Sequence, residues 1–336
     1  MSWRFFIERV LWSVIVIVGI TIVTFVLTRL IPADPARAAA GPEASVEAVQ
    51  TLRTLMGLDR PLPDQYASYM RDLVSLNFGR SIQTQRYVRE DLAAFFPATA
   101  ELAIAVMLVY ATVSIGLGIV AAISQGRALD YAIRIVALVG VGLPAFWLGL
   151  MLQIVFYQHL GWLPAAGRLD PFIASPPRLT GLYVIDSVLT GHWQALGSSV
   201  QHLILPVLAA VVSRLAVGLK LTRISLLEVL GEHYIRTARS KGLPGFIVIY
   251  KHGLRNALIP IVTALGMQFS ALLGGTVIVE VVFAWPGIGR YAVGSIMTLD
   301  LPAIMSVTVV LAVIFLVVNL LVDMLYVWLD PRVKYA

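Results

Sequence analysis

LAIAVMLVYATVSIGLGIVAAISQG, residues 102–126, contains no charged side chain. A helix needs about 20 predominantly apolar residues to cross a bilayer, where only helices and closed barrels satisfy their backbone hydrogen bonds. The rest of the chain has the same character, with 59% hydrophobic and 13% charged residues, a mean hydropathy of +0.85 and no cysteine. The sequence therefore predicts an all-α membrane protein with several spans and without disulfides.

Six windows of this kind predict six transmembrane helices. Five are free of charged side chains, and the fourth is interrupted by Arg214. We keep the fourth because its omission would place the following segment on the wrong side of the membrane. Pro144 lies inside the third window and is expected to kink it. The windows are 10–28, 102–126, 135–158, 201–219, 256–279 and 301–322.

Basic residues in short loops predict the orientation. With six spans and both termini in the cytoplasm, short outer loops keep only Arg168, Arg178 and Arg290. This topology explains the net charge of +6 and leaves a nucleic-acid partner without support. The first apolar run exceeds the roughly 7–15-residue core of an export signal, so we expect an uncleaved anchor. The basic residues on the cytoplasmic side are Lys220, Lys241, Lys251, Lys334, Arg4, Arg9, Arg127, Arg134, Arg223, Arg236, Arg239, Arg255 and Arg332.

The predicted domains are an N-terminus with the first helix at 1–31, an extracytoplasmic helical subdomain at 32–94, and a core transmembrane domain at 95–336. Helical periodicity covers 45–58 and 63–76 of the subdomain. Its simplest role is to cap the outer ends of the spans, which we favour, and its alternative role is to dock an external partner. One helix face is formed by Val46, Val49, Leu52 and Leu55 or Met56.

The core domain contains a cytoplasmic loop at about 223–255 with a short charged helix. Glu232 and Arg236 are four residues apart, and Arg239 follows three later, so they share a stripe. A solvated basic connector would explain these charges. It would not explain a second, small and apolar face that would let a partner approach closely, nor the glycine that ends the helix. This face is formed by Ile235, Ala238 and Gly242.

Three charged residues lie in or beside predicted spans, where charge is costly and points to function by default. Arg214 could line a pathway or bond to a facing carbonyl. For Glu280 we favour a structural bond to a loop amide, and for Asp323 a contact between helices. The scattered histidines have no metal-ligand spacing, so no metal site is predicted. Close helix packing is expected at the glycines Gly116, Gly118, Gly140, Gly142, Gly149, Gly274 and Gly275.

The cytoplasmic helix carries a family resemblance. Arg236-Thr237-Ala238, then Gly242 after three residues, with Leu258-Ile259-Pro260 downstream, resembles the coupling-loop signature of ABC importer permeases, Glu-Ala-Ala-x-x-x-Gly followed by Ile-x-Leu-Pro. The string YIRTARSKGL at 234–243 is closer still to the dipeptide, oligopeptide and nickel branch. Arg236 and Thr237 replace the leading acid and first alanine, so no role of that acid carries over. Further resemblance to the first of the two permease subunits lies at 31–35, 57–61, 65–66, 77–81, 280–289 and 319–323.

The resemblance implies a type I ABC importer permease fold in a prokaryotic inner membrane and a non-catalytic role in peptide transport. It implies a second homologous permease, two ATP-binding subunits, an extracytoplasmic solute-binding protein and lipid as partners. No Gly-x-x-x-x-Gly-Lys-Ser/Thr loop is present, so ATP and Mg are expected on the partners and no cofactor on this chain. The ATPase-coupling residues would be Glu232, Tyr234, Ile235, Arg236, Thr237, Ala238, Arg239, Lys241 and Gly242.

Other functions remain alternatives. Nickel or glutathione-type cargo belongs to the same family. A proton-driven secondary transporter would need paired intramembrane acids or inverted repeats, and Asp323, near the inner end of the last predicted span, is the only clear acid. A membrane-embedded enzyme would need several polar catalytic groups at one depth, which the sequence does not indicate.

Overall fold

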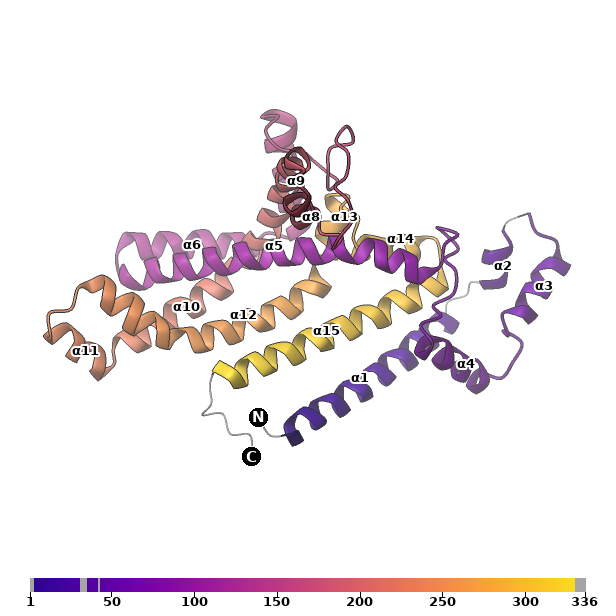
Figure 1. The fold of residues 1–336 in the computed structure, drawn as a ribbon, viewed down its shortest axis with the longest axis horizontal. Coiled ribbons are helices and arrows are strands. Elements are labelled where there is room, and N and C mark those ends of the chain that lie inside the picture. Colours follow the sequence, from indigo (N-terminus) through magenta and orange to yellow (C-terminus); the bar gives the residue numbers. More distant parts are fainter. Residues whose placement is uncertain (1–2, 31–34, 42, 330–336) are drawn as a thin grey trace. The chain divides into compact units, whose positions relative to one another are not determined.

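The computed structural model describes residues 3–30, 35–41 and 43–329, and its regular structure there is helical (Figure 1). Residues 31–34 of the segment at 31–35 and the basic residues Arg332 and Lys334 lie outside these residues. The helices are α1 (Trp3–Leu30), α2 (Pro35–Ala40), α3 (Val46–Leu55), α4 (Leu62–Val74), α5 (Val88–Ile123), α6 (Ala128–Gly142), α7 (Ala145–Leu152), the π-helical turn η1 (Gln153–His159), α8 (Tyr183–Thr190), α9 (Trp193–Val212), α10 (Leu215–Leu230), α11 (His233–Ser240), the π-helical turn η2 (Ile247–Leu254), α12 (Arg255–Gly275), α13 (Val277–Val282), α14 (Ile288–Met297) and α15 (Leu301–Leu329).

Four described helices are long and apolar enough to cross a membrane, namely α1, α5, α9 and α15. A bent pair, α6 with α7 and η1, would raise the number to five. The predicted window at 256–279 corresponds to α12 and the start of α13. These helices confirm the all-α class and the polytopic character that composition predicted.

The predicted third span is not continuous. Helix α6 ends at Gly142 and α7 begins at Ala145, with a bend of 102° between the two parts. Leu143 between them is extended, with φ −91° and ψ 128°, because a following proline disfavours the helical conformation. Pro144 therefore breaks this segment instead of kinking it.

Two other predicted spans are wrong in their bounds. The fourth was predicted at 201–219, but α9 ends at Val212 and Arg214 lies between α9 and α10. The second was predicted from Leu102, but α5 begins at Val88. Its acidic residues Asp91 and Glu101 are buried with partners, so charge does not end the helix there.

The chain divides into two compact units, Met1–Thr99 with Pro286–Leu316, and Ala100–Trp285 with Val317–Ala336. In the first unit, the start of α5 packs against α14 and α15. Tyr291 stacks on Phe95, with ring centroids 5.0 Å apart, and its hydroxyl donates to Asp91 at 3.1 Å. This core consists of Val88, Leu92, Ile288, Tyr291, Ala303 and Val307.

The first unit also contains the predicted outer helices, which are found as α3 and α4. Ser45 caps α3, since its hydroxyl accepts a hydrogen bond from the Ala48 amide at 3.2 Å. The apolar face predicted for α3 is only partly covered, however: Val49 and Leu52 are half-buried, whereas Val46 is 82% and Leu55 78% exposed. Periodicity identified the helix, but it did not show which face the fold covers.

In the second unit, α10 packs against α6 and α12, and close approach occurs at some of the predicted glycines. A Cβ on Gly118 would lie 2.5 Å from Thr222 Cβ, and one on Gly140 would lie 2.8 Å from Val212. Gly149 is also closely packed, against Val282 and Phe283, whereas Gly116 and Gly142 face open space. The close-packing prediction therefore holds for three of these glycines. For Gly274 and Gly275 the structure does not describe the surroundings.

A buried ion pair connects the irregular parts of the second unit. Arg168 donates to Glu101 through Nε at 2.7 Å and to the Gly181 carbonyl through Nη2 at 2.7 Å. The guanidinium carbon also lies 3.8 Å from the ring centroid of Tyr183. Glu101 accepts a second bond from the Val184 amide at 2.8 Å. Because both charges are almost fully buried, each needs its partner.

We expect Glu101→Gln to destabilise the chain by about 3–5 kcal/mol, because Arg168 would remain buried without its counter-charge. Thermal unfolding of the purified full chain in detergent measures this change. Glu90→Gln, an exposed acid on the same helix, is the matched control and should have no such effect. Equal unfolding temperatures for the two variants would contradict the structural role of the pair.

Candidate functional site

Helix α11 is a short, separate element between α10 and η2 (Figure 1). Its N-cap is Glu232, whose backbone is extended and whose carbonyl accepts hydrogen bonds from the Ile235 and Arg236 amides. The helix ends before Gly242, which has φ +74°, a conformation that favours glycine. The Gly242 amide donates to the Arg239 carbonyl at 2.9 Å. The glycine therefore ends the helix as predicted.

The inner face of α11 packs within the chain. Ile235 is fully buried and Ala238 is 8% exposed, and both contact Val248 of η2 and Leu230 of α10. The sequence predicted that these residues would receive a partner on a small-residue face. That part of the prediction is wrong, because η2 returns along the same side of the helix and covers it. Only Gly242 of that face is exposed.

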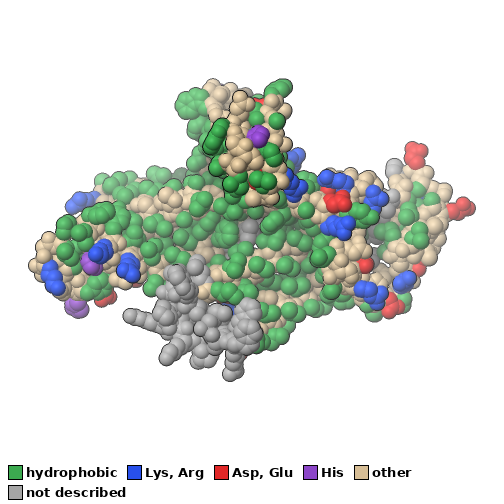
Figure 2. All heavy atoms as spheres, in the orientation of Figure 1, with side chains coloured by type: hydrophobic (Ala, Val, Ile, Leu, Met, Phe, Trp, Pro, Cys, Tyr) green, Lys and Arg blue, Asp and Glu red, His purple; other side chains and the backbone are tan. Residues whose placement is uncertain are grey.

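The outer face of α11 is exposed and mostly basic or polar. Figure 2 shows basic side chains gathered over this end of the second unit. Tyr234 is 42% exposed, and its hydroxyl accepts a hydrogen bond from Asn256 Nδ2 at 2.8 Å. This bond connects α11 directly to the start of α12. The other exposed predicted coupling residues are Glu232, Arg236, Thr237, Arg239, Lys241 and Gly242.

The three predicted pathway residues lie on different elements. Arg214 is half-buried at the junction of α9 and α10, and its Nη1 donates to the Ala210 carbonyl at 3.4 Å. Glu280 is fully buried on α13 and accepts a hydrogen bond from the Thr276 hydroxyl at 3.3 Å. Asp323 is half-buried near the end of α15.

Sequence reasoning missed a buried acid near the coupling segment. Asp130, in the first turn of α6, is 1% exposed and accepts two hydrogen bonds from Arg223 of α10, each 2.8 Å long. It also accepts a bond from the Gly126 amide at 3.1 Å. Like Glu101, this acid lies just outside a predicted span and is buried with an arginine partner. The sequence signal was an acid in the first turn of an amphipathic helix, where a helix-capping role is the usual expectation.

Among the described residues, no group of three or more histidine or acidic side chains could hold a metal ion. The arrangement at α11 instead suits a mechanical contact. One face is fixed to α10 and η2, and the other is free to meet a second protein. Such a helix can pass a displacement to the packed helices behind it.

Comparison with known proteins gives matches along nearly the whole sequence. Residues 114–335 match the family described as the binding-protein-dependent transport system inner membrane component, and residues 2–103 match the N-terminal region of such membrane components. The chain is 44% identical over 331 residues to a probable D,D-dipeptide transport system permease protein of Escherichia coli (strain K12), covering 98% of this chain and 97% of the relative.

Two further relatives cover similar lengths. A dipeptide transport system permease protein of Alkalihalophilus pseudofirmus is 44% identical over 331 residues, covering 98% of each chain. A glutathione transport system permease protein of Escherichia coli (strain K12) is 37% identical over 332 residues, covering 99% of each chain.

Gly242→Val should loosen the end of α11, because a left-handed backbone costs an L-residue about 1–2 kcal/mol and a β-branched side chain fits it poorly. Amide hydrogen exchange at positions 242 and 243 measures the effect, because the amides of both residues donate to carbonyls of α11 in the native chain. The control is Gly245→Val, since Gly245 also faces open space but does not have positive φ. Equal exchange in both variants would show that the glycine is not needed for this turn.

Proposed function

Because the chain belongs to the binding-protein-dependent inner membrane components of ABC importers, and specifically to their dipeptide-type permeases, we propose that it forms one half of the membrane pathway of an ATP-driven peptide importer. The observation that carries this proposal is the 44% identity to two dipeptide permeases over nearly the whole chain. A second, homologous permease would form the other half. ATP hydrolysis would take place on two separate ATP-binding subunits, and this chain would be non-catalytic.

In this proposal, α11 is the coupling helix. Its outer face, which includes Arg236 and Arg239, would sit in a groove on one ATPase subunit. Its inner face would transmit motion, since Ile235 and Ala238 are packed against η2 and α10. Both of those elements also pack against α12. A ligand can shift an alternating-access equilibrium only if the two states bind it differently, so the ATPases must hold α11 differently in each state.

The same proposal fixes the orientation and the outer partner. Residues 223–255 would face the cytoplasm, and the chain would cross a prokaryotic inner membrane several times. Residues 32–94 would form an extracytoplasmic subdomain, for which we take up the alternative role of docking the solute-binding protein. The exposed apolar side chains of α3, including Val46 and Leu55, support such a contact because exposed apolar patches mark protein interaction sites.

Cargo has one specific alternative. The glutathione permease relative at 37% identity favours a γ-glutamyl peptide as a second candidate. Uptake into vesicles that contain the complete transporter, with a labelled dipeptide competing against glutathione, separates the two. Saturable, ATP-dependent uptake of the dipeptide that glutathione does not inhibit is the expected result.

The assembly itself is tested by purifying the tagged chain from its native membrane and identifying the proteins that accompany it. We expect a homologous permease, two P-loop ATPases and, under substrate, a solute-binding protein. Recovery of the chain alone or as a homo-oligomer would overturn the importer assignment and favour a secondary transporter.

Reversing the charge of the outer face should separate the permease from its ATPases. We expect Arg236→Glu combined with Arg239→Glu to reduce ATPase co-purification about tenfold or more, because like or unpaired charges at an interface cost several kcal/mol. Membrane insertion and thermal stability should not change, since both side chains are exposed. Arg127→Glu, in the exposed connection between α5 and α6, is the control. Normal ATPase recovery with the double variant would contradict the assignment of α11.

A further inference from the structure

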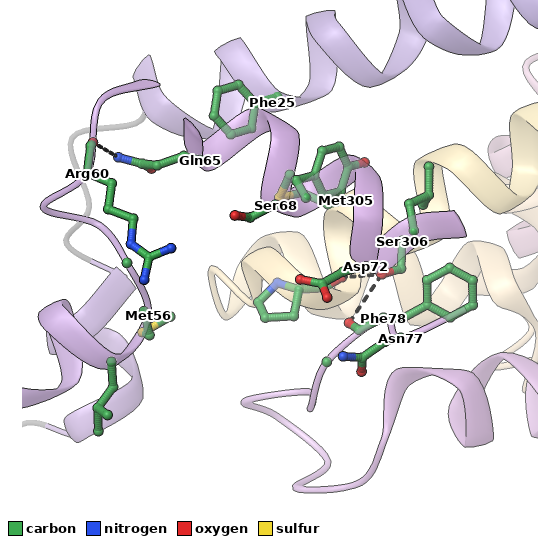
Figure 3. A pocket seen from close by; sticks show the side chains of 16 residues that line it. Phe25, Met56, Arg60, Gln65, Ser68, Asp72, Asn77, Phe78, Met305 and Ser306 are labelled. Atoms are coloured by element: carbon green, nitrogen blue, oxygen red, sulfur yellow. Dashed lines mark hydrogen bonds between the residues drawn. The ribbon is translucent and has the colours of Figure 1, made fainter. Parts of the chain in front are cut away.

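A cavity of about 400 Å³ opens within the first unit (Figure 3). It is bounded by α1, α4, the connection between α3 and α4, and the first two turns of α15. Its volume falls within the roughly 300–1,000 Å³ of small-molecule sites. Such sites combine apolar walls with a few polar groups, and this one does so. The apolar part of the lining is formed by Phe25, Leu55, Met56, Leu73, Phe78, Pro302 and Met305.

Two opposite charges line this cavity, Arg60 from the connection and Asp72 from α4. Figure 3 shows them on different sides of the open space, with Ser68 between them. Among the residues that the structure describes, neither side chain has a hydrogen-bond or ion-pair partner. The cavity therefore offers one free cation and one free anion to a small ligand.

Two buried polar atoms in the same lining also lack partners within the described part of the chain, Tyr69 Oη and Gln65 Oε1. The Gln65 amide nitrogen donates to the carbonyls of Leu58 and Arg60, at 3.1 and 2.7 Å, which leaves its oxygen as an acceptor. Burial, with the nearby Tyr66, raises the pKa of Tyr69 to about 12, so its hydroxyl remains a donor. A buried polar atom without a partner is costly, and a ligand that supplies one binds more tightly.

We propose that this cavity binds a small zwitterionic peptide. Arg60 holds the terminal carboxylate, Asp72 holds the terminal ammonium, and Gln65 and Tyr69 bond to the peptide group between them. Arg60 suits this role because its guanidinium matches a carboxylate in two-point geometry. The choice of a peptide as ligand rests on the proposed function, and it places a peptide contact on the outer unit of the permease.

The test is equilibrium dialysis of radiolabelled L-alanyl-L-alanine against the purified full chain in lipid nanodiscs, without a solute-binding protein. We expect saturable binding that Arg60→Gln and Asp72→Asn each weaken about tenfold or more, since each removes a charge-assisted hydrogen bond. Arg71→Gln and Asp64→Asn change the same residue types on α4 outside the cavity lining and are the controls. All four variants should keep the wild-type unfolding temperature.

Modified ligands assign each end of the peptide to one side chain. N-acetyl-L-alanyl-L-alanine has no ammonium, so it should bind weakly and should be insensitive to Asp72→Asn. L-alanyl-L-alanine amide has no carboxylate and should be insensitive to Arg60→Gln. L-alanine has both charges but no peptide group, so about tenfold weaker binding is expected.

Absence of saturable binding, or equal binding by all four variants, would overturn the proposal. Equal binding of L-alanine would overturn the assignment to peptides. If the cavity variants weakened only the binding of a solute-binding protein, the cavity would be a protein contact and the proposal would also fail. ATP-dependent dipeptide uptake by the complete transporter is measured in parallel. If uptake is normal and the cavity variants bind L-alanyl-L-alanine as the native chain does, only this site is rejected. If there is no uptake and no ATPase accompanies the chain, the proposed function itself is rejected.

Discussion

The second unit depends on the buried ion pair of Glu101 and Arg168. Removing two charges from water is unfavourable unless geometry and further hydrogen bonds compensate both. Here each group has a second interaction, to the Gly181 carbonyl for the arginine and to the Val184 amide for the acid. The pair therefore fixes a connection of more than twenty residues that has no helix of its own, between η1 and α8. The neighbouring Gly167 amide bonds to the Phe283 carbonyl, which holds the end of α13 as well.

In the proposed coupling role, α11 needs two different faces. A coupling helix that touched only its partner would rotate without moving the permease. Burial of Ile235 and Ala238 against η2 and α10 prevents this, and the Tyr234 bond to Asn256 adds a connection to α12. The Asp130–Arg223 pair fixes α10 to α6 about two turns before the end of α10. This buried ion pair therefore holds packed helices together behind α11.

The α11 motif shows how far sequence reasoning reached at the candidate site. Its charged stripe and its terminal glycine were both predicted, because helix periodicity and glycine at positive φ are local properties. The direction of burial was predicted wrongly, since a helix of this length offers two plausible contact faces. Only the return of η2 determines which one is covered. The same limit applies to α3, where periodicity located the helix and the fold left part of its apolar face exposed.

By itself, the sequence determined the membrane class, the position of most helices, an irregularity at Pro144 and the resemblance to peptide permeases. Each of these is encoded in a short window by hydropathy, by proline and glycine geometry or by a contiguous motif. Tertiary structure decided the partners of Glu101 and Asp130, the place of Arg214 between two helices, and the cavity that joins Arg60 and Asp72. The physical reason is sequence separation: the Glu101–Arg168 and Asp130–Arg223 partners are 67 and 93 residues apart, so only folding brings them into contact.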